Sequence, residues 1–166
     1  MVRTGRDTFG ALRAVANAGN AFFRGADRNL AGIGLSFREF QALMTLAESG
    51  QLSMVDLAND LNITQAGTTS VVDRLEGNGL VERVRSKKDR RVINIRVTGK
   101  GRKTFEQALR VYKSFIERTF SPLTDQEVGL LAVAFDKIRK GAETAQETGS
   151  VAPAARKSVR QRATRG

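Results

Sequence analysis

The sequence predicts a mainly α fold with a small β-wing (α+β), and three observations support this prediction. Helical patterns that begin at capping residues cover most of the 166 residues. Leu80–Thr98 holds two runs in which apolar and polar residues alternate, and the second run is rich in β-branched residues. Between the runs lies Ser86–Arg91, in which five of the six residues are charged. The order helix, turn, helix and basic hairpin predicts a winged helix-turn-helix.

The first predicted element is a helix that begins after Asp7 and runs to about Asn29. Its apolar residues recur at helical spacing, and Asp7 is a suitable N-cap. The Gly32-Ile33-Gly34 sequence then interrupts the pattern. Residues 1–34 are therefore expected to contribute a single helix.

Three shorter helices are predicted next. Ser36 and Glu39 form a capping box, in which the serine hydroxyl and the glutamate carboxylate each accept a backbone N–H. This helix ends at Gly50, Ser53 caps the second helix, and Thr64 caps the third, which runs to about residue 76. Together with the hairpin, these helices predict a winged helix-turn-helix domain over residues 35–98.

The third helix is the predicted reading helix, because the second helix of such a motif enters the major groove. Its expected buried side consists of Val71, Val72 and Leu75, with Ala66 or Thr68 near the crossing point. Its expected free side consists of Gln65, Gly67, Thr69, Ser70, Asp73 and Arg74. Glycine inside a helix costs about 1 kcal/mol relative to alanine, so either a neighbouring helix or a DNA backbone is expected close to Gly67. An ordinary solvated face is the alternative interpretation of these polar residues.

Two more helices are predicted after the hairpin. Thr98 caps a long helix over residues 99–119. A second capping box begins at Thr124 and opens a helix to about residue 141, with a frayed extension to residue 148. Apolar residues cover more than one stripe of this last helix, which predicts contact with a partner as well as with its own chain.

The formal net charge of +11 is concentrated in two segments. Ten basic and two acidic residues lie between Val81 and Lys103, and five basic and no acidic residues lie in 149–166. The rest of the chain is slightly acidic, so the clustering indicates a polyanionic partner rather than general solubility. Residues 149–166 are expected to be a basic disordered tail, which either attracts phosphate non-specifically or is merely solvated.

The chain contains no cysteine and no histidine, which excludes disulfides, thiolate metal sites and sites that depend on imidazole. The sequence shows no nucleophile–base pair, phosphate-binding loop or metal cluster, so we predict that the protein is not an enzyme and uses no cofactor or metal. No apolar run is long enough to span a membrane, and the N-terminus lacks a signal-peptide core. We therefore expect a cytoplasmic, nucleoid-associated protein without a membrane partner.

The chain from Leu35 to about Leu109 resembles the MarR family of winged helix-turn-helix transcriptional regulators. The resemblance rests on the order and spacing of five motifs: Leu35–Phe40, Leu57–Thr64, Val72–Arg83, Asp89–Arg91 and Val97–Gly101. It implies a homodimer in which the helices of residues 1–34 and 99–148 form a dimerisation lobe. It also implies binding of double-stranded DNA at a pseudo-palindromic operator, most often as a repressor.

The resemblance also implies individual DNA contacts. Arg91 matches the family's minor-groove arginine, and Asp89 matches the aspartate that pairs with it and aims it. Ser36, at a helix N-terminus, would offer backbone amides to a phosphate. The full predicted DNA-binding set is Ser36, Gln65, Gly67, Thr68, Thr69, Ser70, Arg74, Lys87, Lys88, Asp89, Arg90 and Arg91.

Many members of this family are released from DNA by small aromatic anions, which adds a small-molecule effector to the expected partners. The corresponding pocket would lie near Phe22, Phe23, Arg24, Arg28, Phe40 and Met44. The alternative is that these aromatic residues belong to the core. A different function, that of an architectural nucleoid-type DNA-binding protein with little sequence preference, would also fit the high pI and the basic tail.

Overall fold

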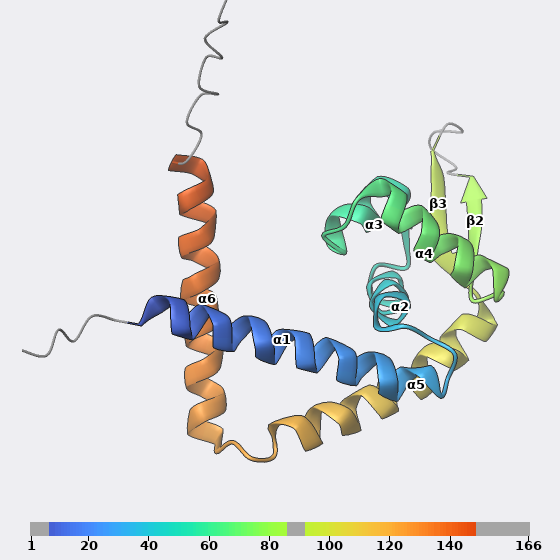
Figure 1. Ribbon diagram of the computed structural model, residues 1–166. Coiled ribbons are helices and arrows are strands. Elements are labelled where there is room, and N and C mark those ends of the chain that lie inside the picture. Colours follow the sequence, from blue (N-terminus) through green and yellow to red (C-terminus); the bar gives the residue numbers. More distant parts are fainter. Residues whose placement is uncertain (1–6, 86–91, 149–166) are drawn as a thin grey trace, which may run out of the picture. The chain divides into compact units, whose positions relative to one another are not determined.

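The computed structural model describes residues 7–85 and 92–148, and it confirms the predicted mainly α fold with a small sheet (Figure 1). Residues up to Ser121 form one compact unit and residues from Pro122 form a second, and each unit is described by itself. The elements are α1 (Thr8–Ala31), α2 (Phe37–Ser49), β1 (Gln51–Ser53), α3 (Met54–Asp60), α4 (Gln65–Gly77), β2 (Val81–Arg85), β3 (Ile93–Val97), α5 (Gly99–Phe120) and α6 (Asp125–Thr148).

Hydrogen bonds from side chains fix where the helices begin, as the sequence predicted. Asp7 Oδ1 accepts the Gly10 N–H at 2.8 Å and Thr64 Oγ1 accepts the Gly67 N–H at 3.1 Å. Both halves of the Ser36–Glu39 capping box are formed. Each such bond satisfies an N–H group that has no partner within its own helix, which is worth about 1 kcal/mol.

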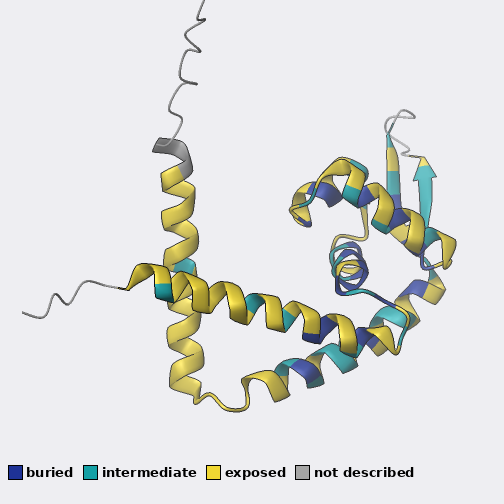
Figure 2. Cartoon of the chain, viewed as in Figure 1, coloured by how far each residue is buried: buried dark blue, intermediate teal, exposed yellow. Residues whose placement is uncertain are grey.

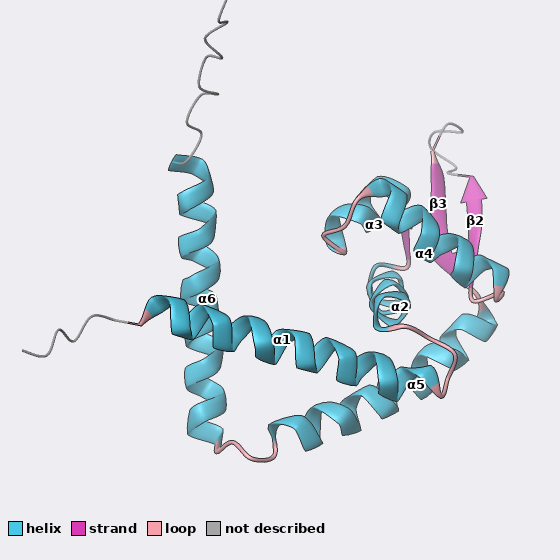
Figure 3. Cartoon of the chain, viewed as in Figure 1, coloured by secondary structure: helices cyan, strands magenta, loops and turns pink. Residues whose placement is uncertain are grey.

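The sheet has three antiparallel strands in the order β1-β3-β2 (Figure 3). The predicted hairpin supplies β2 and β3, and Ile95 of β3 pairs with Arg83 on one side and with Leu52 of β1 on the other. The strand β1 was not predicted, because three residues are too few for an alternating pattern to be recognised. Its pairing with β3 closes the edge of the hairpin next to α2.

The core of the first unit is built around α2, which packs against α1, α3, α4, α5 and the sheet. Figure 2 shows much of α2 in the colour of buried residues. Phe40, Leu43 and Leu46 have no exposed surface. Each fully buried side chain of this kind contributes about 1.5–3 kcal/mol of hydrophobic free energy, so α2 is the main support of the helices around it.

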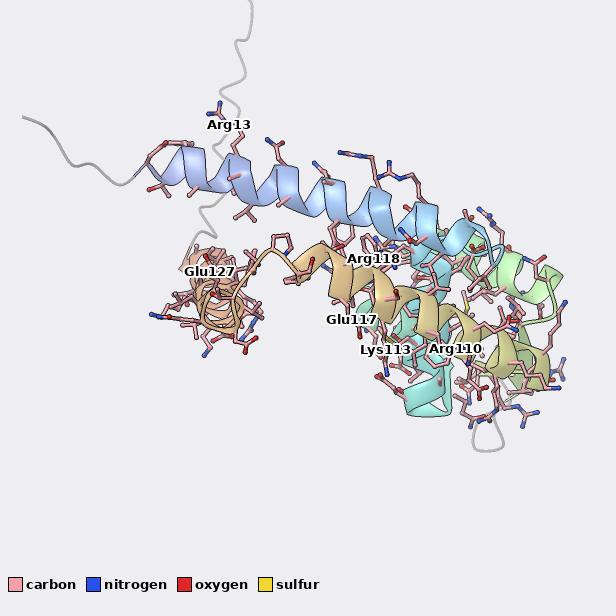
Figure 4. All side chains as sticks on the ribbon, turned by 90° about the horizontal axis from the view of Figure 1, so that it is seen from below. Arg13, Arg110, Lys113, Glu117, Arg118 and Glu127 are labelled. Atoms are coloured by element: carbon pink, nitrogen blue, oxygen red, sulfur yellow. The ribbon has the colours of Figure 1, made fainter. Side chains whose placement is uncertain are left out.

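Aromatic rings join α1 and α5 to α2. Phe22 of α1 lies 5.2 Å from Phe115 of α5, and Phe40 of α2 lies 4.8 Å from Tyr112 of α5, measured between ring centroids. Arg118 adds a polar contact, because its guanidinium donates to Asn29 Oδ1 at 3.1 Å (Figure 4). The same figure shows Arg110, Lys113 and Glu117 on the opposite, solvent-facing side of α5.

The hairpin and α5 meet at a very close contact. Thr98 Oγ1 accepts the Gly101 N–H at 3.0 Å and donates to the Gly79 carbonyl at 2.7 Å. Gly101 is buried, and a Cβ atom at this position would lie 1.9 Å from the Leu80 carbonyl oxygen. Only glycine therefore allows α5 to begin directly beside the strand that leads into the hairpin.

The second unit contains α6, and its predicted capping box is formed. The Thr124 N–H donates to Glu127 Oε2 at 2.8 Å, and the Glu127 N–H donates to Thr124 Oγ1 at 3.3 Å. The Thr124 backbone N–H and hydroxyl together lower the pKa of the Glu127 carboxyl. The helix reaches Thr148, which agrees with the predicted extension beyond residue 141. Among the described residues, no helix has the length and apolarity needed to cross a membrane.

Candidate nucleic-acid interface

The predicted helix-turn-helix is formed by α3, a four-residue turn and α4 (Figure 3). Asn62 in this turn has a φ of 50°, a left-handed conformation that asparagine tolerates better than most residues. Thr64 then caps α4. The turn directs α4 across α2 and α3, with its inner side held by Val72 and Leu75, which have no exposed surface.

The outer side of α4 carries small polar residues. Gln65, Thr69 and Ser70 are exposed, and the Thr69 hydroxyl donates to the Gln65 carbonyl at 3.0 Å. That bond uses the proton of the Thr69 hydroxyl, and its oxygen can still accept hydrogen bonds. Because these side chains are short, a groove wall would be able to approach the helix backbone closely.

The position of Thr68 differs from the prediction that it contacts DNA. Its side chain has no exposed surface, and its hydroxyl donates to the Thr64 carbonyl at 3.1 Å. A DNA contact through this side chain is therefore wrong, and Thr68 is the residue that lies at the crossing point, whereas Ala66 is exposed. A threonine suits a buried helix position despite its polarity, because its hydroxyl can donate to a carbonyl of the preceding turn while its methyl group packs against apolar neighbours.

Gly67 was expected to lie against either a neighbouring helix or DNA. The nearest atoms to a Cβ at this position are Thr64 Oγ1 at 3.3 Å and the Ile63 side chain at 3.7 Å. Both belong to the turn that precedes the helix, so the packing of another helix does not account for the glycine. Close approach of DNA at Gly67 stays a prediction.

Backbone amides at Ser36 were predicted to contact a phosphate, and two of them have acceptors within the protein, so the contact stays a prediction. The Ser36 N–H donates to Glu39 Oε2 at 2.7 Å, and the Phe37 N–H donates to Asp27 Oδ1 of α1 at 2.7 Å. These donors therefore already have acceptors inside the protein. Two carboxylates now occupy this helix end, and they would repel a phosphate that approached it.

Arg74 has a partner that was not predicted from the sequence. Its Nε lies 3.0 Å from Oε1 of Glu39, although 68% of the arginine side chain is exposed. Glu39 is 1% exposed. Arg74 is thus attached to the core at one edge of its guanidinium, while most of the side chain lies in solvent on the same side of α4 as Ser70.

A second ion-pair cluster connects the hairpin to α4. Arg83 of β2 lies between two carboxylates of α4, with Nη2 at 2.6 Å from Asp73 Oδ1 and Nη1 against Glu76. The hydrogen bond to Asp73 is the largest cause that raises the pKa of Arg83, burial opposes it, and the Glu76 carboxylate adds to it. Asp73, expected on the free side of α4, is therefore engaged with the hairpin. The signal available in the sequence was the spacing of Asp73 and Glu76, two acidic residues three positions apart on one helix, which suits them to share a basic partner.

The base of the hairpin carries further contacts of charged side chains. Glu82 and Arg96 face each other across β2 and β3, with 2.7 Å between Oε1 and Nη2. Lys100 Nζ donates to the Asn78 carbonyl at 2.7 Å, at the C-terminal end of α4. The predicted DNA contacts at the hairpin tip, namely Lys87, Lys88, Asp89, Arg90 and Arg91, lie outside the described residues.

The predicted effector residues lie on α1 and α2, and the structure distributes them between core and surface. Phe40 has no exposed surface and Phe22 packs against Phe37, Tyr112 and Phe115, which agrees with the core alternative. Met44 packs against the core, and Phe23 is 51% exposed. Arg24 and Arg28 are exposed one turn apart on α1. An effector site at these residues stays a prediction.

Comparisons with known proteins agree with this geometry. The MarR family model matches residues 35–93. The HTH-type transcriptional repressor MdtR of Bacillus subtilis (strain 168) is 32% identical over 111 residues, which cover 67% of this chain and 72% of MdtR.

Two solved structures show the same fold. A mutant MarR from E. coli complexed with operator DNA has a TM-score of 0.73 at 22% identity and covers 80% of this chain and 98% of that chain. The organohalide-sensing regulator RdhR in its 2,4-dichlorophenol-bound form has a TM-score of 0.72 at 20% identity, covering 85% of this chain and 88% of that chain. The resemblance seen in the sequence motifs is confirmed by the family model and by MdtR, and the chain belongs to the MarR family of HTH-type transcriptional regulators.

Proposed function

We propose that the protein binds a pseudo-palindromic DNA operator as a homodimer, with α4 of each subunit in a major groove. The exposed row of Gln65, Thr69 and Ser70 is the observation on which this proposal mainly rests, because such short side chains suit direct contact with base edges. The two copies of α4 would meet grooves one helical turn apart, about 34–36 Å along the duplex. The mutant MarR solved with operator DNA shares this fold and supports the proposal.

The hairpin would supply the second contact. Its tip carries Lys87, Lys88, Arg90 and Arg91 by sequence, and we propose that Arg91, aimed by Asp89, enters the minor groove. The other basic residues would contact phosphates. The Arg83 cluster supports this arrangement, since it fixes the base of the hairpin to the helix that would occupy the groove.

Exposed apolar residues support the homodimer. In the first unit, Phe9 and Leu12 at the start of α1 are 87% and 62% exposed. In the second unit, Leu130 and Ile138 of α6 are 61% and 57% exposed. Exposed apolar patches of this kind mark interaction sites in soluble proteins, and a second copy of the chain offers matching ones.

Repression follows from operator binding when the operator overlaps a promoter, and MdtR, a repressor, is a relative that supports this role.

We propose that an aromatic anion releases the protein from DNA. Exposed Arg24 and Arg28, beside a half-exposed Phe23, offer cations next to an aromatic face. Titration of benzoate into the complex with fluorescently labelled operator should lower the anisotropy, and no effect up to millimolar concentrations would contradict this part of the proposal.

Selection of bound sequences from a random duplex library tests the main proposal. We expect an enriched palindrome with two half-sites about one turn apart. Binding to that duplex should exceed binding to a scrambled one by at least about 10³-fold at the same salt concentration. A smaller ratio together with a steep salt dependence would instead support the architectural alternative.

Substitution of Thr69 by alanine is expected to relax base preference. Loss of the hydroxyl and methyl removes one contact, so discrimination at one position of each half-site should fall by about 1–2 kcal/mol. Competition assays with operators mutated at single positions measure this change. Thr69→Ser keeps the hydroxyl and serves as the control, and an unchanged preference in Thr69→Ala would mean that Thr69 does not face the bases.

Substitution of Leu130 by glutamate is expected to break the dimer. Burial of a leucine contributes about 1.5–3 kcal/mol, and placing a charge at an apolar contact costs more, so the dimer dissociation constant should rise by more than about tenfold. Sedimentation velocity at micromolar concentration would then show the monomer mass. Gln126→Glu adds the same charge at a polar position of α6 and should leave the dimer intact. Equal behaviour of the two variants would place the interface elsewhere.

A further inference from the structure

Glu39 is the only charged residue among those described that lies fully in the core, with 1% of its surface exposed. Its two oxygens have separate tasks. Oε2 accepts the N–H and the hydroxyl of Ser36, each at 2.7 Å, which completes the capping box of α2. Oε1 takes no part in this cap and lies 3.0 Å from Arg74 Nε on α4. A capping box requires only the first oxygen, so the second oxygen calls for another explanation.

We propose that Glu39 is a positioning residue, which aims the Arg74 guanidinium at a DNA phosphate. The inference rests on the proposed operator binding and adds a residue that itself makes no DNA contact. Arg74 lies in the last turn of α4, one turn beyond Ser70 on the outer side. When the N-terminal part of a reading helix enters the groove, its last turn lies near the sugar-phosphate backbone.

The geometry of the guanidinium explains how one contact sets the direction of the others. Its five N–H donors lie in one plane and in a fixed fork. Oε1 of Glu39 is buried and accepts no hydrogen bond, so its partner is the guanidinium charge, with Nε at 3.0 Å. This ion pair anchors one edge of the planar guanidinium and thereby restrains where the two Nη groups point. Glu39 is Arg74's only ion-pair partner among residues 7–85 and 92–148, and 68% of the arginine side chain is exposed. The Nη groups therefore remain available for the two parallel hydrogen bonds that a phosphate accepts.

Holding Arg74 in this way lowers the cost of binding. A free arginine side chain loses much rotamer freedom when it engages a phosphate. Arg74 has already lost part of that freedom in the free protein, because its partner is itself immobilised by Ser36 and by the surrounding core. The pair is also expected to strengthen when DNA displaces water from the arginine.

Simple electrostatics predicts the opposite effect for removal of Glu39. A carboxylate beside a polyanion is repulsive, so neutralising it should strengthen DNA binding if Glu39 serves only the fold. If Glu39 positions Arg74, neutralising it should weaken binding. The two explanations thus differ in the sign of one measured change.

The test is Glu39→Gln in the 166-residue chain, assayed on the operator found by library selection. Glutamine has nearly the same shape, so its carbonyl can keep the Ser36 cap while its uncharged NH₂ faces Arg74 Nε and cannot form the ion pair. We expect affinity to fall by about tenfold, and the slope of log affinity against log salt to fall by about one phosphate contact. In an Arg74→Ala background, Glu39→Gln should cause no further loss.

Three results would overturn the inference: equal or tighter binding by Glu39→Gln, an unchanged salt slope, or the same loss in the Arg74→Ala background. A thermal melt accompanies each assay. If Glu39→Gln proves unfolded, Arg74→Lys decides the question, since it keeps the charge and leaves the Ser36 cap intact but lacks the planar fork. Unchanged affinity in Arg74→Lys would then refute the positioning role. Failure of the wild-type chain to bind any duplex would instead refute the proposed function.

Discussion

Substitution of Gly101 by alanine is expected to destabilise the first unit by about 3 kcal/mol or more. The new Cβ would lie 1.9 Å from the Leu80 carbonyl oxygen and 2.8 Å from Val97 Cγ1, far inside van der Waals contact. Relief of this clash requires α5 to move away from the hairpin. Such a movement also strains the hydrogen bonds that the Leu80 carbonyl accepts from Thr98, at 3.0 Å from the backbone N–H and 3.2 Å from the hydroxyl. Urea denaturation followed by circular dichroism measures the loss.

Gly99→Ala is the matched control, because it lies two residues earlier in the same helix and its Cβ would meet no atom within 4 Å. Alanine is also the better helix former, so this variant should be as stable as the wild type or slightly more so. Equal stability of the two variants would mean that the close approach of α5 to Leu80 does not exist in solution.

Substitution of Ser70 by glutamate is expected to reduce operator affinity by about 100-fold or more. Ser70 is exposed in the middle of the outer side of α4, where the proposal places the groove. A longer, negatively charged side chain there would both obstruct close approach and repel phosphates, and a like-charge juxtaposition costs several kcal/mol. Fluorescence anisotropy on the selected operator measures the change, while the melting temperature should remain near that of the wild type because the side chain is solvated.

Gln107→Glu serves as the control for net charge. Gln107 is exposed on α5, which packs mainly against α1 and α2. It adds the same charge to the chain, so only a small decrease in affinity is expected from the overall field. If both variants lose affinity equally, the outer side of α4 is not the reading surface.

Local signals in the sequence predicted most of the fold. Asp7, Ser36 and Thr64 were recognised as caps because each acts on an N–H only three residues away, within reach of motif analysis. The alternation that predicted β2 and β3 is local in the same sense. These interactions require no knowledge of the rest of the chain.

Contacts between distant segments could not be predicted in this way. The pairing of Arg74 with Glu39 spans two helices, and the pairing of Arg83 with Asp73 joins a strand to a helix. Both arginines have several acidic residues available along the sequence, and only the packing of α2 and β2 on α4 determines which of them become partners. The DNA contact predicted for Thr68 failed for a related reason. Helical spacing left both Ala66 and Thr68 as candidates for the crossing point, and Thr68 is the one that packs in the core.

The pairing of arginines around α4 has a consequence for how quickly DNA finds the protein. Arg74, Arg83 and Arg96 each hold a carboxylate nearby, so from a distance each pair acts as a dipole rather than as a full positive charge. A count of basic residues therefore overstates the attraction that this face exerts on an approaching duplex. The encounter rate should depend on the basic residues that lack such partners, and the paired arginines should affect mainly how long the complex lasts.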